Sequence, residues 1–288
     1  MTDLQRAELS LFSELLHICT ELKLKYYLVC GSALGAAKYK GFIPWDDDLD
    51  VGLPRPDYER FIRLAPQLLP EHVFLQNYHS DPAFPQIFSK LRDSRTTFVE
   101  KTASELPINH GVYIDIFPID GYPEAPAEIR RFELLKKMWH LQAQCAFKSK
   151  CSMKAQIFFS AERMLGYARR TDRTMAKMDA LFKSYSPESS EIWCNHGNWQ
   201  GKLEYHLKSV YGEGYMTSFE GLEVCIPAQY DAYLTQKYGD WRADLPEEER
   251  VGHHYTAVID LNRPYTDYIE ILPKGKARLI EPPSKDNK

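Results

Sequence analysis

Four carboxylates fall within five consecutive positions of the chain, at Asp46, Asp47, Asp48 and Asp50. Residues two apart on a strand point to the same side, so Asp48 and Asp50 should project together from a strand over residues 49–53. Such a pair of hard oxygen ligands suits Mg²⁺ or Mn²⁺. A solvated acidic turn after Pro44 is the alternative interpretation, but it does not explain why the acids alternate with apolar residues. The spacing therefore predicts a metal site.

A third acid, Asp115, stands alone in the apolar stretch YIDIF at residues 113–117. A buried carboxylate is costly unless it is paired or bound to a metal. Pairing with a neighbouring arginine would satisfy it, but two other acids already need a cation, and we favour a shared metal. Asp115 is therefore the third candidate ligand.

Basic and small residues near these acids suggest contacts to phosphate. Gly31 and Ser32 follow an apolar strand and precede a short helix, so backbone N–H groups at this turn can face an anion. Such turns are common, and this one gains weight because Asp48 follows sixteen residues after Ser32. Lys90 and Arg92 share one face of a strand and are further candidates, with a solvated pair as the alternative.

The elements that must position these residues follow from hydrophobic periodicity and from Gly and Pro punctuation. The expected helices cover residues 2–22, 33–40, 56–68 and 227–238. The expected strands cover residues 26–30, 49–53, 73–76, 88–91, 97–100, 112–117 and 223–226. Residues 128–185 carry no strong strand signal, so two or three helices are expected there, broken near residues 150–152. The tail after Pro273 should fray.

Composition excludes several classes of protein. The 288 residues carry a net charge of −4, which argues against a protein that coats nucleic acid. The six cysteines form no Cys-x-x-Cys pair, so a zinc ribbon or a disulfide framework is not expected. No signal peptide or membrane-length apolar run is visible, and we expect a cytoplasmic protein.

Charge is unevenly distributed along the chain. Residues 130–177 contain twelve Lys or Arg and three Asp or Glu, a local net charge of +9. A solvated helix face is one interpretation of this block. The other is a patch that faces an anionic target, either lipid at the inner face of the membrane or a phosphate-rich, lipid-linked acceptor.

The chain resembles the LicD phosphocholine transferase family, which includes fukutin and fukutin-related protein. Gly31-Ser32, Asp48-x-Asp50 and the isolated Asp115 are similar to the three-part signature of the nucleotidyltransferase fold. The family's opening motif is matched by GSALGAAKYKGFIPWDDDLDVGLPRPDYERF. Three more segments fit the same pattern, namely KLRDSRTTFVE, HGVYIDIFPIDGYP and IPAQYDAYLTQKYGDW. The resemblance covers about residues 21–123 and resumes near residue 219.

This resemblance implies a fold of class α/β (α+β), a nucleotidyltransferase-like mixed sheet flanked by helices with a largely helical middle region. We expect a catalytic core at residues 1–127 and a helical, basic insert or acceptor- and choline-side subdomain at 128–215. Residues 216–288 should complete the catalytic domain. Many family members carry Arg near Lys38, which adds Lys38 to the candidate phosphate-binding residues.

The resemblance also implies the reaction, which is metal-dependent transfer of phosphocholine from CDP-choline with release of CMP. The acceptor would be a hydroxyl of a sugar or polyol phosphate, in a lipopolysaccharide or teichoic acid precursor. Asp48 and Asp50 would hold the metal, and Asp115 would share it or act as base. Transfer of ribitol or glycerol phosphate, nucleotidyl transfer, and an inactive nucleotide- or glycan-binding relative are the alternatives.

A choline donor needs a site for its quaternary ammonium, which aromatic side chains can provide. Aromatic residues are frequent in one later segment, and the candidates for a choline cage there are Trp193, Trp199, Tyr205, Tyr211 and Tyr215. Aromatic residues at such spacing also occur in hydrophobic cores. The histidines show no metal-ligand spacing, and we expect them to be structural.

Overall fold

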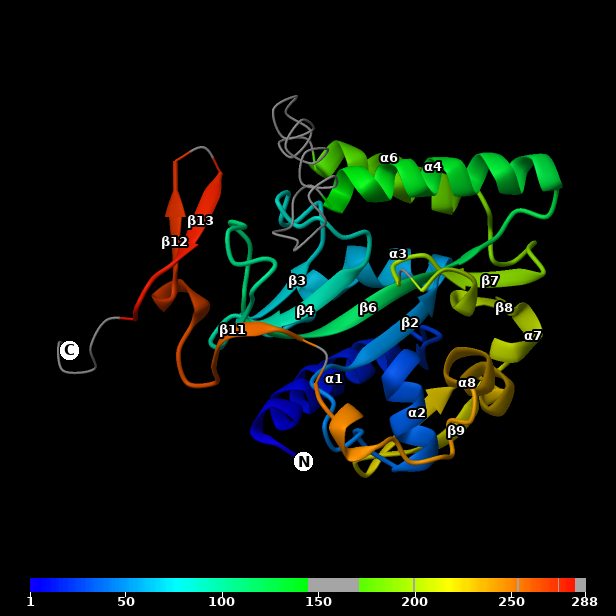
Figure 1. The fold of residues 1–288 in the computed structure, drawn as a ribbon, viewed down its shortest axis with the longest axis horizontal. Helices are drawn as coiled ribbons and strands as arrows, with labels where there is room; N and C mark the ends of the chain where they lie inside the picture. The colour runs from blue at the N-terminus through cyan, green and yellow to red at the C-terminus, as the bar shows by residue number, and fades with distance from the viewer. Residues whose placement is uncertain (145–170, 199, 253, 274, 283–288) are drawn as a thin grey trace.

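The computed structural model describes residues 1–144, 171–198, 200–252, 254–273 and 275–282 (Figure 1). The α-helices are α1 (Asp3–Glu21), α2 (Cys30–Lys38), α3 (Arg55–Leu64), α4 (Pro126–Gln144), α6 (Thr171–Lys183), α7 (Lys208–Tyr211) and α8 (Tyr230–Tyr238). The strands of the main sheet are β1 (Tyr27–Leu28), β2 (Asp50–Pro54), β3 (Val73–Gln76), β4 (Ser89–Asp93), β6 (Val112–Gly121), β7 (Ile192–Asn195) and β8 (Tyr205–Leu207). Smaller pairs are formed by β5 (Thr97–Glu100) with β11 (Thr256–Asp260), β9 (Tyr215–Phe219) with β10 (Leu222–Ile226), and β12 (Ile269–Leu272) with β13 (Lys276–Leu279). The expected mixed α+β class is confirmed.

A seven-stranded mixed sheet lies at the centre of the molecule. Its main path runs β1-β2-β6-β4-β3, and β7 and β8 extend it from the later part of β6. Strands β2 and β6 are parallel, whereas β6 is antiparallel to β4 and to β7. Every residue of β6 is buried, as expected for a central strand that is covered on both faces.

The register of these strands brings together three of the predicted site residues. Asp50 of β2 is the partner of Asp115 on β6, and Asp115 is in turn the partner of Lys90 on β4. Partners across neighbouring strands lie on the same face of a sheet. The side chains of Asp50, Asp115 and Lys90 therefore lie in a row across the adjacent strands β2, β6 and β4.

Helices cover both faces of the sheet (Figure 1). Helix α1 begins at the N-cap Thr2, which forms a capping box with Gln5, and it packs against β6. Helix α2 packs against α8 on the same side of the molecule. Helices α4 and α6 lie side by side on the opposite side and contact each other directly.

Two hydrophobic clusters correspond to these layers. The larger one combines α1, the central strands and later segments that include Trp193, Tyr211 and Tyr233. A smaller one joins α4 and α6 to the sheet through Phe132, Met178 and their neighbours. The larger core thus takes residues from all three predicted parts of the chain, and the division at residues 127 and 215 stays a prediction.

Most expected elements occur within a few residues of their predicted bounds. Strands β3 and β5 match the prediction, and α8 ends where Gly239 takes a φ of 68°. The expected strand over 26–30 is shorter, because the chain turns at Cys30, whose φ is 52°. Helix α2 therefore starts at Cys30, and Gly31 and Ser32 lie in its first turn instead of in a preceding loop.

The C-terminal expectation was partly wrong. Strand β13 lies beyond Pro273 and forms a hairpin with β12, because their backbones pair in register from Ile269 with Leu279 to Leu272 with Lys276. The break near residues 150–152 and most of the basic block over 130–177 lie outside the described residues. In the part of the chain that is described, no helix is both long enough and apolar enough to cross a bilayer.

A buried ion-pair network joins α6 to α3 and β6. The Arg55 guanidinium, at the start of α3, donates two hydrogen bonds of 2.6 and 2.7 Å to the two carboxylate oxygens of Asp120 on β6. It also donates to Asp179 of α6 at 2.9 Å. The side chains of Asp120 and Asp179 are 0% and 7% exposed, so their charges need partners: Arg55 serves both, and Lys183 also pairs with Asp179 at 2.6 Å.

We expect Arg55→Ala to lower the free energy of unfolding by about 3–5 kcal/mol, because it leaves two buried carboxylates without their guanidinium. Arg60→Ala on the same helix is the matched control. Its side chain is 44% exposed and lies 3.6 Å from Asp57, so its loss should cost less than about 1 kcal/mol. Chemical denaturation measures both effects, and equal midpoints for the two variants would contradict the prediction.

Candidate functional site

The loop that precedes β2 gathers the acids into one cluster. One oxygen from each of Asp46, Asp47 and Asp48 lies within 4.8 Å of the others. The Gln5 side chain of α1 holds the loop, because its Nε2 donates to the backbone carbonyls of Ile43 and Asp46 at 3.1 and 3.0 Å. Helix α1, which sequence reasoning did not connect with the site, thus fixes the backbone that carries the acids.

Helix α2 approaches the same loop closely. A Cβ atom at Gly31 would lie 2.8 Å from Asp46 Oδ2, so glycine makes this approach possible. The Ser32 hydroxyl accepts the backbone N–H of Asp50 at 2.8 Å. Gly31 and Ser32 therefore lie beside the acids as predicted, and each has a structural role there.

Burial and mutual repulsion raise the pKa values of these acids. Burial, and next the charge of Asp47, raise the pKa of Asp46 to about 6. Burial, and next the charge of Asp46, raise the pKa of Asp48 to about 7. The pKa of Asp50 is also raised well above its usual value, by burial and then by the charge of Asp48. The cluster lacks enough positive charge to keep all of its members ionised at neutral pH.

Glu8 is a further acid that sequence reasoning missed. It lies on α1, is 2% exposed, and its Oε2 has no hydrogen-bond partner in the structure. Burial raises its pKa well above the usual value, followed by the charges of Asp48 and Asp46. Helical spacing marks Glu8 as a polar residue near the apolar stripe of α1, which is the one signal that could have identified it.

Asp115 already has a cation as a neighbour. The Lys90 ammonium lies 2.8 Å from Asp115 Oδ1 and 3.2 Å from the centre of the Tyr113 ring. The guanidinium of Arg92 lies over the same ring at 4.7 Å, which confirms that Lys90 and Arg92 share one face. Arg92, however, is 1% exposed and donates to the carbonyl of Gly111 at 2.7 Å. This placement gives Arg92 a structural partner and leaves Lys90 as the cation at the acids.

A second cation comes from the far end of the chain. His254 Nδ1 lies 3.1 Å from Asp47 Oδ1. Burial alone would lower the pKa of His254, but the hydrogen bond to Asp47 and the charge of Asp48 outweigh it and raise the pKa to about 9. The contact with Asp47 thus favours the cationic form of His254 at neutral pH. The two residues are about 200 positions apart, so the sequence did not predict their contact.

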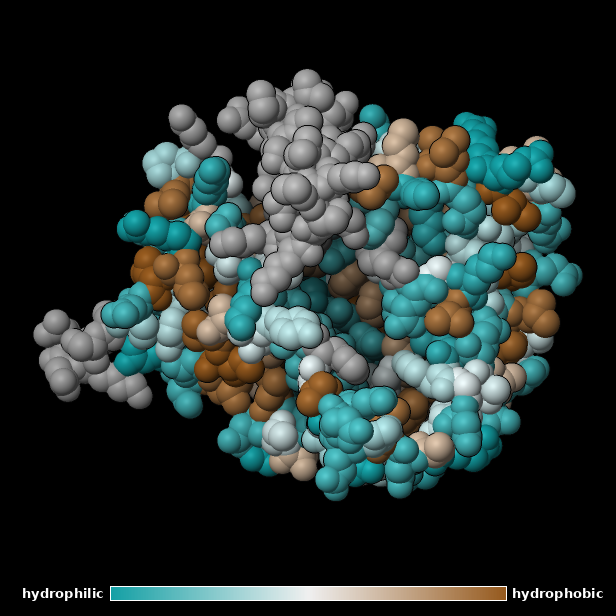
Figure 2. Space-filling view, viewed as in Figure 1, coloured by the Kyte–Doolittle hydropathy of each residue, from teal (hydrophilic) through white to brown (hydrophobic). Residues whose placement is uncertain are grey.

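A cavity of about 520 Å³ opens beside the acids. Its lining includes the predicted residues Gly31, Lys38, Asp48 and Asp50, together with Asp46 and His254. The Lys38 ammonium pairs with Asp244 at 2.9 Å and donates to the carbonyl of Ala243 at 2.8 Å. On the face shown in Figure 2 the surface is hollowed near its centre, and hydrophilic side chains lie in the depth of the hollow.

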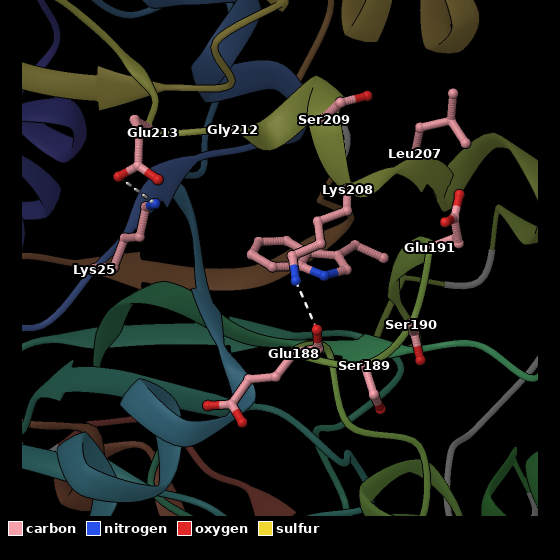
Figure 3. A pocket seen from close by; sticks show the side chains of 11 residues that line it. Lys25, Glu188, Ser189, Ser190, Glu191, Leu207, Lys208, Ser209, Gly212 and Glu213 are labelled. Carbon is pink, nitrogen blue, oxygen red and sulfur yellow. Dashed lines mark hydrogen bonds and ion pairs between the residues drawn. The ribbon is translucent and has the colours of Figure 1, made fainter.

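Of the five aromatic residues predicted to form a choline cage, the four that the structure describes do not converge on one site. Trp193 and Tyr211 pack together in the larger core with ring centroids 5.5 Å apart, and Trp193 also lines a separate groove (Figure 3). Tyr205 packs in the smaller cluster against Tyr122. Tyr215 of β9 is 48% exposed and contacts Tyr230, the first residue of α8. Trp199 lies outside the described residues.

The lysines that line the groove at Trp193 already have partners within the protein. Lys208 lies 5.8 Å from the Trp193 ring and donates to the carbonyl of Glu188 at 2.7 Å (Figure 3). At the other end, Lys25 pairs with Glu213 at 3.0 Å. No predicted phosphate-binding or metal-binding residue lines this groove.

The donor set fits a divalent cation. The convergent oxygens of Asp46–Asp48 and the raised pKa values of Asp48 and Asp50 are what a buried acidic cluster shows when it has excess negative charge. Asp48 is one of these converging acids, and it is also one of the three ligands predicted from the sequence. Asp115 pairs with Lys90, so that it would reach a metal only by sharing its oxygens between the two cations.

The raised pKa values predict how stability depends on pH when no divalent cation is present. Asp46 and Asp48 hold protons more tightly in the folded state than the usual value of 3.8. Their contribution to stability is therefore complete below about pH 4 and is lost as the pH rises to about 7. Asp48→Asn should raise the free energy of unfolding in EDTA at pH 8 by about 1 kcal/mol or more, with a smaller difference at pH 4.5.

Thermal or chemical denaturation at the two pH values measures this effect. Glu71→Gln is the matched control, because Glu71 is an exposed acid outside the cavity. A loss of stability in Asp48→Asn at pH 8 would contradict the electrostatic account of the cluster.

Comparison with known proteins agrees with this geometry. Residues 23–164 match the family model described as LicD/FKTN/FKRP, nucleotidyltransferase domain. The chain is 29% identical over 244 residues to the lipopolysaccharide cholinephosphotransferase LicD of Haemophilus influenzae, which covers 82% of this chain and 89% of the relative. Two uncharacterised proteins, from Rickettsia typhi and Rickettsia prowazekii, are 40% and 38% identical over 50 residues, 17% of this chain and 16% and 19% of theirs.

The matched region contains Asp48, Asp50 and Asp115, with Lys38 and Lys90 beside them. The longer match extends well beyond it, over most of both chains. Together the acidic site and these similarities identify an enzyme of the phosphotransferase class, whose residues 23–164 match the nucleotidyltransferase domain of the LicD family.

Proposed function

We propose that the chain transfers phosphocholine from CDP-choline to a hydroxyl of a lipopolysaccharide glycan and releases CMP. The observation that carries this proposal is the meeting of Asp48, Asp50 and Lys38 at one cavity of about 520 Å³, a size typical of a small-molecule site. The similarity to a cholinephosphotransferase over 82% of the chain supports choline as the transferred alcohol.

Asp48 and Asp50, with Asp115, are the residues that would hold Mg²⁺ or Mn²⁺. A divalent cation supplies positive charge that neutralises the diphosphate and the departing CMP. The nucleotidyltransferase-like fold expected from the sequence places such acids on adjacent strands, and the parallel pairing of Asp50 with Asp115 supports this assignment.

The displacement itself requires positioned groups and a place for one proton. The oxygen of the acceptor hydroxyl attacks the phosphorus that carries choline, and the bond from that phosphorus to the bridging oxygen breaks as CMP leaves with the electron pair. The hydroxyl proton passes to a carboxylate, and Asp115 takes this role where Asp48 and Asp50 hold the metal without it, with Lys90 fixing its position. Lys38 lies at the cavity wall, where its ammonium can exchange Asp244 for a donor phosphate.

A donor screen tests the reaction. We expect purified protein with lipopolysaccharide and Mg²⁺ or Mn²⁺ to release CMP from CDP-choline and to label the glycan with choline. EDTA should abolish the release, and added metal should restore it. Asp48→Asn and Asp50→Asn should each lower kcat by about 10³-fold or more, because the transition-state charge loses its stabilisation.

Glu223→Gln is the control variant, since Glu223 is an exposed acid on β10, outside the cavity. CMP release from CDP-ribitol or CDP-glycerol, but not from CDP-choline, would show that the transferred alcohol is not choline. Pyrophosphate release from a nucleoside triphosphate would indicate nucleotidyl transfer. Full activity in Asp48→Asn, or no product from any donor, would overturn the proposal.

A further inference from the structure

Aromatic side chains gather on the wall of the acidic cavity itself. Tyr39 and Trp45 reach it from the segment after α2, and Tyr238 and Trp241 reach it from the end of α8. None of the four belongs to the segment in which sequence reasoning placed a choline cage. They line the same cavity as Asp48 and Asp50, so a ligand that engages these acids also meets the aromatic wall.

The rings of this wall already bind cations within the protein. The guanidinium of Arg250 lies 5.3 Å from the Trp45 ring centroid. That of Arg242 lies 4.3 Å from the Trp241 ring. The ammonium of Lys38 lies 5.5 Å from the Tyr39 ring. The rings are therefore able to bind a cation, and a quaternary ammonium would use the opposite ring face or displace the cation that the protein supplies.

The two halves of the wall are held next to each other. Tyr39 meets Trp45 edge to face, with ring centroids 6.2 Å apart and planes at 78°. The ion pair from Lys38 to Asp244, at 2.9 Å, ties the end of α2 to the segment that follows Trp241. The indole N–H of Trp241 donates to Asp231 at 3.0 Å, which fixes the orientation of its ring. Tyr39, Trp45 and Trp241 are thus oriented before a ligand binds.

The charge and chemistry of the cavity favour one class of ligand group. Its lining includes the carboxylates of Asp46, Asp48, Asp50 and Asp240. A quaternary ammonium has no N–H to donate, so it relies on ring faces and on nearby negative charge. A neutral hydroxyl group or a primary ammonium would instead donate hydrogen bonds to these carboxylates and would not need the ring faces.

We propose that Tyr39, Trp45 and Trp241 form the subsite for the quaternary ammonium group of the donor. This inference rests on the proposed function, and it specifies which part of the cavity recognises choline. The acids at one end would hold the metal that neutralises the diphosphate, and the aromatic wall receives the trimethylammonium group. Selection of choline over other alcohols thus depends on two segments, the one after α2 with Tyr39 and Trp45 and the one after α8 with Trp241.

Binding measurements on the full chain test this subsite. We would titrate the protein, in the presence of Mg²⁺, with CDP-choline, CDP-ethanolamine and CMP, using calorimetry. Trp45→Ala should weaken CDP-choline binding about tenfold or more and change the Kd for CMP less than about twofold. Trp45→Phe should retain most of the affinity, because it keeps an aromatic face. Tyr39→Ala should weaken CDP-choline binding in the same selective way.

Tyr215→Ala is the matched control, since Tyr215 is an exposed aromatic residue that does not line the cavity. Circular dichroism and thermal unfolding verify that each variant is folded. Equal losses for CMP and CDP-choline would assign Trp45 to the cytosine base and overturn the subsite. Unchanged CDP-choline affinity in Trp45→Ala would overturn the subsite alone. Failure of the unaltered protein to bind CDP-choline would overturn the proposed function together with it.

Discussion

Like charges in a poorly solvated interior repel one another, and the fold has to oppose that repulsion between Asp46, Asp48 and Asp50. It does so through the backbone. Gln5 binds two carbonyls of the acidic loop, and Ser32 binds the N–H of Asp50. The parallel pairing of β2 with β6 then fixes the strand on which the loop ends. The acids stay together because their main chain is not free to separate them.

Positive charge reaches the cluster from elements that are distant in sequence. Lys90 comes from β4 and faces Asp115, and His254 follows α8 and faces Asp47. Lys237 on α8 is buried and pairs with Glu204, and its charge lowers the pKa of Asp50 against the larger effect of burial. These cations offset part of the negative charge and leave an excess that a divalent ion can balance.

The sequence predicted the parts of this site that depend on local pattern. The acidic spacing identified Asp48 and Asp50, which line one cavity although Asp48 lies in the loop before β2, and the apolar run around Asp115 showed that this acid would be buried. Long-range contacts leave no such pattern, so Glu8 and His254 were missed. The choline cage was sought where aromatic residues are densest, but Trp193 and Tyr211 fill the core there, because large rings serve packing more often than recognition.

The anchoring of the acidic loop by α1 determines how far this domain can be divided. The family match begins at residue 23 and ends at residue 164, whereas Gln5 and Glu8 precede it and Trp241 and His254 follow it. A fragment cut at those boundaries would keep Asp48, Asp50 and Asp115 and lose the helix that holds the acidic loop. A chimaera that exchanges donor specificity with a relative would have to carry α1 and the segment after α8 along with the strands. The smallest transplantable unit is therefore assembled from three separate stretches of chain.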